Sequence, residues 1–162
     1  MRIEQSFTVR RPPAEVFAYM TDPANLAAWQ PSKVAVEPLT PGPPRQGYRL
    51  RERTRIGRRE WDQIVEFTEF EPARALATHI VDGAVPVDGR WALSPEGANG
   101  TRVRFVAEGE LSGAMKLASP LLRLGIARSF RQYHALLTEQ VEGQPSSSSQ
   151  SPERSHGGGQ PR

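Results

Sequence analysis

Residues 115–141 read MKLASPLLRLGIARSFRQYHALLTEQV, and this stretch decides the fold. Its large apolar side chains recur at spacings of three and four residues, at Leu122, Ile126, Phe130, Tyr133, Leu137 and Val141. That spacing predicts an amphipathic helix of about seven turns, at 3.6 residues per turn. Arg123, Arg131 and Glu139 lie between these positions and are expected to face water. The apolar stripe must be buried against another element.

The predicted partner of this helix is an antiparallel sheet, formed by a first strand over residues 3–9 and by a meander over residues 33–111. Between residues 48 and 56 arginines occupy every second position, at Arg49, Arg51, Arg53 and Arg55. The alternate positions are Tyr48, Leu50, Glu52, Thr54 and Ile56. Since successive side chains of a strand point to opposite faces, this segment has an arginine face and a mainly apolar face. The sheet is therefore expected to curl around the helix with its apolar face inward.

Two short helices are predicted between the first strand and the meander. Pro12 and Pro13 end the strand, because proline cannot donate to a strand ladder. The first helix carries its apolar side chains on one face, at Val16, Phe17 and Met20. Asp22 and Pro23 then break the chain, and Asp22 is the expected N-cap of a second short helix over residues 26–29.

Composition narrows the class of protein further. The 162 residues include 21 Lys and Arg and 18 Asp and Glu, which gives a net charge of +3. The chain has no cysteine, which excludes disulfides, thiolate metal sites and a cysteine nucleophile. No apolar run reaches the roughly 20 residues needed to cross a bilayer, and the first residues lack the apolar region of a signal peptide, so we expect a cytoplasmic protein without a transmembrane segment. Residues 143–162 are rich in Ser, Gly and Pro and predict a disordered tail after a single domain of residues 1–142.

Three segments of the chain resemble the START-like (SRPBCC) superfamily of polyketide cyclases/dehydrases and lipid transport proteins. The most specific is residues 11–29, RPPAEVFAYMTDPANLAAW, which look like the opening of that superfamily. Residues 66–74, EFTEFEPAR, resemble its mid-sheet turn, with Ala73 in place of the usual second proline. Residues 100–103, GTRV, fit the start of its last long strand.

The resemblance implies an α+β helix-grip fold, in which a seven-stranded antiparallel sheet wraps around the long C-terminal helix and two short helices follow strand 1. It also implies a cavity between sheet and helix for a lipid, polyketide, isoprenoid or other small hydrophobic molecule. The same fold hosts enzymes and carriers, and no invariant catalytic set defines the superfamily, so none is transferred to this chain.

The candidate catalytic residues are Glu52, His79 and Tyr133. Glu52 shares a strand face with Tyr48 and Leu50, and an apolar cavity would raise the pKa of its carboxyl group and suit it for proton transfer. Turning this strand over would instead bury four arginines, at a far larger cost. Asp62 and Glu66 could share the cavity, or they could pair with arginines of the preceding strand on the outer face, the arrangement we expect. The predicted ligand-binding residues are Tyr48, Leu50, Glu52, Trp91, Phe105, Phe130 and Tyr133, although these aromatic side chains could equally be core.

Several other kinds of site are not expected. His79 and His134 have no second ligand at metal spacing, so each is predicted to be structural or exposed rather than a metal ligand. No Gly-rich phosphate loop is present, which argues against a nucleotide cofactor, and no other cofactor is expected. The arginines of residues 49–55 are followed by Glu60, Asp62 and Glu66 on the strand that pairs with them, so we expect no nucleic-acid binding.

Three hypotheses about function remain open at this point. A binding or carrier protein would have a cavity with neutral polar groups only. A polyketide aromatase/cyclase- or dehydratase-like enzyme would need a carboxylate or imidazole inside the cavity. A protein-interaction module, with an unidentified protein partner, would have a collapsed cavity and an exposed apolar patch.

Overall fold

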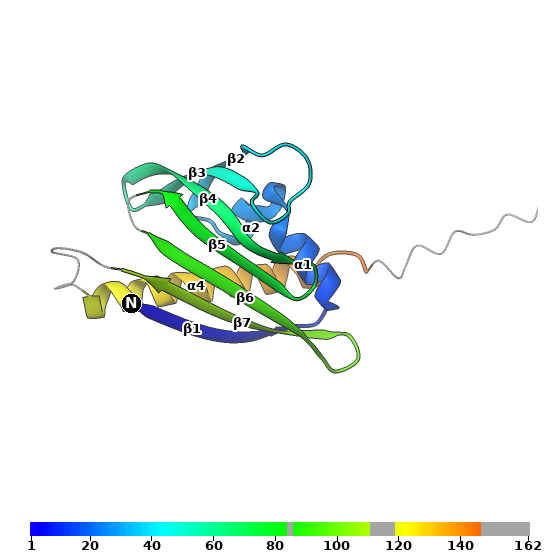
Figure 1. Cartoon of the computed structure of the whole chain (residues 1–162). Helices are drawn as coiled ribbons and strands as arrows, with labels where there is room; N and C mark the ends of the chain where they lie inside the picture. The colour runs from blue at the N-terminus through cyan, green and yellow to red at the C-terminus, as the bar shows by residue number, and fades with distance from the viewer. Residues whose placement is uncertain (84–85, 111–118, 147–162) are drawn as a thin grey trace, which may run out of the picture.

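The computed structural model describes residues 1–83, 86–110 and 119–146 of the chain (Figure 1). The elements follow the order β1 (Arg2–Val9), α1 (Pro13–Thr21), η1 (Pro23–Asn25), α2 (Leu26–Trp29), β2 (Lys33–Pro38), β3 (Arg49–Ile56), β4 (Arg59–Glu71), β5 (Ala75–Asp82), β6 (Val87–Glu96), β7 (Gly100–Gly109) and α4 (Ser119–Glu142). The predicted strand, two short helices, meander and long helix are therefore all present.

The seven strands form one antiparallel sheet in the order β1-β7-β6-β5-β4-β3-β2. β1 pairs with β7, the last strand, so the first and last parts of the sheet lie side by side. α4 runs along the sheet, and α1 and α2 lie near the C-terminal end of α4 (Figure 1). This arrangement is the helix-grip fold, as predicted.

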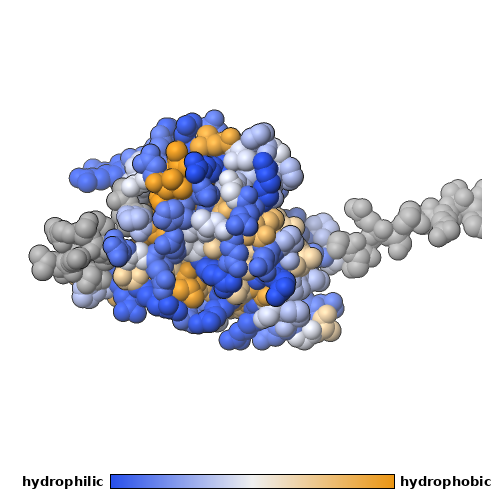
Figure 2. Space-filling view, in the orientation of Figure 1, coloured by the Kyte–Doolittle hydropathy of each residue, from blue (hydrophilic) through white to orange (hydrophobic). Residues whose placement is uncertain are grey.

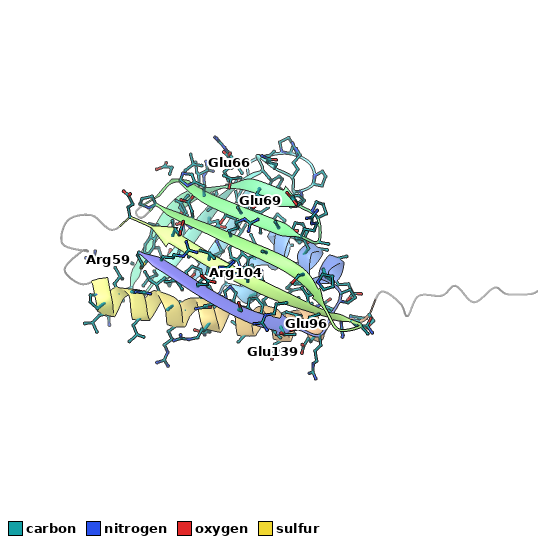
Figure 3. The ribbon with its side chains drawn as sticks, turned by 60° about the horizontal axis from the view of Figure 1, so that its bottom comes forward. Arg59, Glu66, Glu69, Glu96, Arg104 and Glu139 are labelled. Atoms are coloured by element: carbon teal, nitrogen blue, oxygen red, sulfur yellow. The ribbon has the colours of Figure 1, made fainter. Side chains whose placement is uncertain are left out.

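Ion pairs between neighbouring strands cover the outer face of the sheet. On β3, Arg49 pairs with Glu66 and Arg53 with Asp62, the two carboxylates lying on the neighbouring β4. The hydrogen bond from Arg53 holds the pKa of the Asp62 carboxyl below its usual value. The outer position expected for the acids of β4 is thus confirmed. Glu66, Glu69 and Arg104 are labelled on this face in Figure 3, and the surface seen in Figure 2 is mostly hydrophilic.

One end of the inner face is closed by α1. Phe17 of α1 packs edge-on against Phe70 at 5.0 Å between ring centroids, and Phe70 stacks on Phe67 at 6.1 Å. Phe67 in turn contacts Tyr48 at 5.7 Å. Asp22 caps a helix as predicted, but a different one: its carboxylate accepts a 2.9 Å hydrogen bond from the Ala24 amide at the start of η1, whereas the N-cap of α2 is Asn25. Aromatic side chains therefore fill this end of the inner face.

α4 is buried along only part of its length. Leu137 and Val141, in its C-terminal half, are fully buried, whereas Leu121 and Leu124 in the first turns are exposed. Ile126, Phe130 and Tyr133 lie between these two regions and are half-buried. The start predicted for this helix at residue 115 and most of the predicted tail lie outside the described residues. Among the described helices, none is long and apolar enough to cross a membrane.

Candidate functional site

A cavity of about 510 Å³ lies between the inner face of the sheet and the first half of α4. Strands β3 to β7 supply its floor and α4 supplies its roof. Its apolar lining includes Val65, Ile80, Val87, Trp91, Phe105, Ala107, Ile126 and Phe130. It opens to solvent beside Ile56, whose side chain is 64% exposed. The volume lies within the range of about 300–1,000 Å³ that is typical of small-molecule sites.

Aromatic rings form the deep end of the cavity. Phe105 of β7 lies 4.7 Å from Trp91 and 4.6 Å from Phe130 between ring centroids, so the three rings join sheet to helix. Beside them, Gly89 takes a position where a Cβ would come within 3.2 Å of both the Thr78 hydroxyl and the Trp91 ring. The absence of a side chain at Gly89 therefore leaves this part of the floor open.

Uncharged polar groups line the other end. Tyr133 of α4 donates a 2.7 Å hydrogen bond from its hydroxyl to Oγ of Ser32, in the loop before β2. Thr54 and Gln63 lie on the adjacent strands β3 and β4. The Thr54 hydroxyl oxygen is buried and has no hydrogen-bond partner among the described residues. This end of the cavity can therefore form hydrogen bonds but presents no carboxylate.

Glu52 is buried next to the cavity but does not line it. Only 2% of this residue is exposed, and its Oε2 accepts hydrogen bonds from Lys33 Nζ and, at 3.0 Å, from Gln63 Nε2. The ion pair with Lys33 balances the charge that an isolated buried carboxylate would otherwise carry at great cost. Glu52 thus contacts the cavity wall through Gln63 and not directly.

The predicted ligand-binding residues divide into two groups. Trp91, Phe105, Phe130 and Tyr133 line the cavity. Tyr48, Leu50 and Glu52 do not line it, and a role of these three in ligand binding stays a prediction. Tyr48 and Leu50 face inward as expected, but they lie at the other end of β3, among buried side chains of the hydrophobic core. Strand alternation indicates on which face of the sheet a side chain lies, but it does not indicate whether that part of the face meets packed core or a cavity.

His79, a predicted candidate for catalysis, lies outside the cavity. Its ring Nδ1 lies 2.6 Å from the Asp88 carboxylate on the outer face of the sheet, and 43% of its side chain is exposed. Its neighbours along β5, Thr78 and Ile80, are the residues that line the cavity. Because side chains alternate along a strand, His79 points away from any molecule inside.

The other histidine of the domain is buried in a chain of hydrogen bonds. Trp91 Nε1 donates to His134 Nε2 at 3.2 Å, His134 Nδ1 lies 2.9 Å from Gln5 Oε1, and Gln5 Nε2 donates to the Ala127 carbonyl at 2.8 Å. Because an indole nitrogen only donates, Nε2 of the imidazole accepts and Nδ1 carries the proton. Burial lowers the pKa of His134 to about 4, so the ring is neutral.

The sequence analysis missed several polar residues of the site. Lys33, Gln63 and Ser32 were not singled out, although Gln63 alternates with Trp61 and Val65 on the inward face of its strand. The one signal for Lys33 was its rarity, since the chain has only two lysines. Within the described residues, no three His, Asp or Glu side chains gather as a metal site would require.

The comparisons with known proteins agree with this architecture. The chain superposes on the di-domain ARO/CYC BexL from the BE-7585A biosynthetic pathway with a TM-score of 0.72 and 20% identity, over 88% of this chain and 46% of that one. For the Zhui aromatase/cyclase from Streptomyces sp. R1128 the values are 0.69 and 19%, over 88% and 93%. For a START superfamily protein from Mycobacterium smegmatis they are 0.71 and 14%, over 87% and 97%.

No curated protein sequence matches the chain. The identities to the solved structures are low, so these likenesses show the fold alone. Residues 1–142, which include every strand and the whole of α4, match the family described as polyketide cyclase/dehydrase and lipid transport. The chain therefore belongs to the polyketide cyclase/dehydrase and lipid transport family.

Proposed function

We propose that this protein binds one small hydrophobic molecule, such as a lipid, polyketide or isoprenoid, in the cavity between the sheet and α4, and acts as a carrier or binding protein in the cytoplasm. The observation that carries the proposal is the lining of the cavity: apolar and aromatic walls with uncharged polar groups at one end. Burial of apolar ligand surface against such walls supplies affinity, and a few polar groups supply orientation.

A cyclase- or dehydratase-like enzyme is the second candidate. The family includes cyclases, and the Tyr133 hydroxyl borders the cavity, where it could donate a proton to a ligand oxygen. The carrier is favoured because Glu52, the one buried carboxylate near the cavity among the described residues, is paired with Lys33 and lies behind Gln63. A protein-interaction module is the least favoured candidate, because it calls for a collapsed cavity.

Fluorescence titration with the neutral probe N-phenyl-1-naphthylamine tests the binding role. The wild-type protein is expected to bind one probe molecule with enhanced emission. Ala107→Leu is expected to weaken binding at least tenfold, since Ala107 is buried in the cavity floor and a larger side chain there fills the space that the probe needs. The matched control is Ala77→Leu on the outer face of β5.

Binding that Ala107→Leu leaves unchanged, in a variant with a wild-type melting temperature, would contradict the proposal. Tyr133→Phe separates carrier from enzyme once a ligand is known. A carrier loses at most the contribution of one hydrogen bond to affinity, whereas an enzyme using this hydroxyl keeps its affinity and loses turnover.

A further inference from the structure

Four polar residues of the cavity, Ser32, Thr54, Gln63 and Tyr133, gather at one side of it, and the strand register shows why. Lys33 lies opposite Thr54, and the Arg55 amide donates a 2.7 Å hydrogen bond to the Ser32 carbonyl, so Ser32 is held against this part of β3. Gln63 lies on the other side of β3, opposite Glu52. The aromatic end of the cavity is built on β6 and β7, across the sheet.

The residues that form the polar end, Ser32, Thr54, Gln63 and Tyr133, are uncharged. Two residues with a charged group border the cavity in the described part of the chain, Arg55 and Met1. Arg55 is paired with Glu60 on the exposed side of the sheet, and the Met1 amino group donates to the Gly109 carbonyl at 2.7 Å. An anionic group placed at the polar end would lose its hydration without gaining a cation there, which is costly, because the Arg55 guanidinium is paired with Glu60 and the Met1 ammonium lies on the β7 side of the cavity.

Hydrogen-bonding capacity is nevertheless left over. Thr54 is 8% exposed, and its hydroxyl finds no partner in the described part of the chain. Ser32 Oγ accepts from Tyr133, so its own hydrogen remains available. Gln63 directs its amide nitrogen to Glu52, so its carbonyl oxygen remains an acceptor. A buried polar group without a partner is destabilising, and the protein recovers this loss when a ligand supplies the partner.

We propose that Thr54, Gln63 and the Ser32–Tyr133 pair form an oxygen-binding subsite, which selects an uncharged ligand bearing a hydroxyl or carbonyl group at one end of an aromatic body. This inference rests on the binding role proposed above. Exchange between staggered rotamers of Thr54 swaps its methyl and hydroxyl groups and turns the oxygen toward the ligand. The ligand body then lies along the aromatic walls formed by Trp91, Phe105 and Phe130, where offset or edge-on ring contacts are favourable.

Three probes of one shape test this subsite: phenanthrene, 9-phenanthrol and phenanthrene-9-carboxylate. Their affinities are measured by displacement of N-phenyl-1-naphthylamine from the full-length protein. We expect 9-phenanthrol to bind about 3- to 10-fold more tightly than phenanthrene, the gain of one net hydrogen bond. The carboxylate is expected to bind at least 10-fold more weakly than the phenol.

Thr54→Val tests whether the subsite includes the Thr54 hydroxyl, since valine keeps the shape of threonine and removes the hydroxyl. The preference for the phenol over the hydrocarbon is expected to fall to about one, with phenanthrene affinity unchanged as evidence that the variant is folded. Thr68→Val, an exposed position on β4, is the matched control and should keep the preference.

Equal affinity for phenol and hydrocarbon in the wild type, tight binding of the carboxylate, or an unchanged preference in Thr54→Val would each overturn the subsite while leaving the binding role intact. Failure of every probe to bind the wild type would instead overturn the binding role, and the subsite with it.

Discussion

Trp91 of β6 and His134 of α4 are joined by a buried hydrogen bond of 3.2 Å, in which the indole nitrogen donates to the imidazole. This bond ties the helix to the sheet directly beside the cavity, and it forms only with a neutral imidazole. The ring of His134 also stacks on Phe7 at 4.5 Å and meets Phe105 edge-on at 4.8 Å. The contact between helix and sheet therefore depends on the protonation state of one residue.

Acid is expected to destabilise the fold through His134. Its pKa is lowered from 6.5 to about 4 by burial, so between these values the unfolded chain binds more protons than the folded one. The stabilising contribution is present in full above pH 6.5 and is lost as pH falls toward 4. A shift of this size corresponds to about 3 kcal/mol. Urea unfolding of the wild type from pH 4 to 7.5 measures this loss.

The control for this experiment is His134→Gln, which keeps a hydrogen-bonding side chain and does not titrate. Outer-face carboxylates such as Glu4, Asp62 and Glu69 have pKa values lowered by hydrogen bonds from arginines. Their protonation lowers the stability of both proteins alike at the acid end of the range. The difference between the two proteins thus isolates His134. A difference that does not change between pH 4 and 6.5 would contradict this account of its burial.

The buried Lys33–Glu52 pair predicts strongly non-additive effects. Lys33→Met leaves the Glu52 carboxylate buried without its cation and should cost about 3 kcal/mol in the free energy of unfolding at pH 7. Adding Glu52→Leu removes the unpaired buried charge and should recover at least half of that loss in stability. Chemical denaturation of the wild type, both single variants and the double variant measures the coupling. Strictly additive losses would show that the two groups do not interact.

Two leucines of α4 should differ sharply in their importance. Leu137 is fully buried, and Leu137→Ala is expected to cost about 3 kcal/mol through lost burial and the void that remains. Leu124 is 62% exposed, and Leu124→Ala should change stability by less than about 0.5 kcal/mol. Thermal and urea unfolding of the pair compare them directly. Similar losses at both positions would mean that the first turns of the helix are also packed.

Much of the fold could be predicted because periodicity reports directly on which side of an element is buried. The alternation in β3 placed its arginines outward, and the stripe of α4 identified Leu137 and Val141 as core. The site was less predictable. The same stripe includes Phe130 and Tyr133, which border a cavity, because pattern does not distinguish a face that meets protein from one that meets an open space.

The polar part of the site depends on contacts between segments that are distant in sequence. Ser32 meets Tyr133, and Lys33 meets Glu52, only after the loop before β2 has been brought against β3 and α4. His134 was predicted only to be structural or exposed, since its partners Trp91 and Gln5 lie 43 and 129 residues away in the chain. Such partners are determined by tertiary structure and leave no local signature.

The most direct test of a ligand cavity between the sheet and α4 is solution NMR of the methyl-labelled protein with bound 9-phenanthrol. Ile80 and Val87 on the sheet, together with Ile126 on the helix, all line the cavity. The account predicts intermolecular NOEs from the aromatic protons of one bound molecule to methyl groups on both of these elements. Contacts confined to exposed apolar residues away from the cavity, such as Val34 and Leu39, would contradict it.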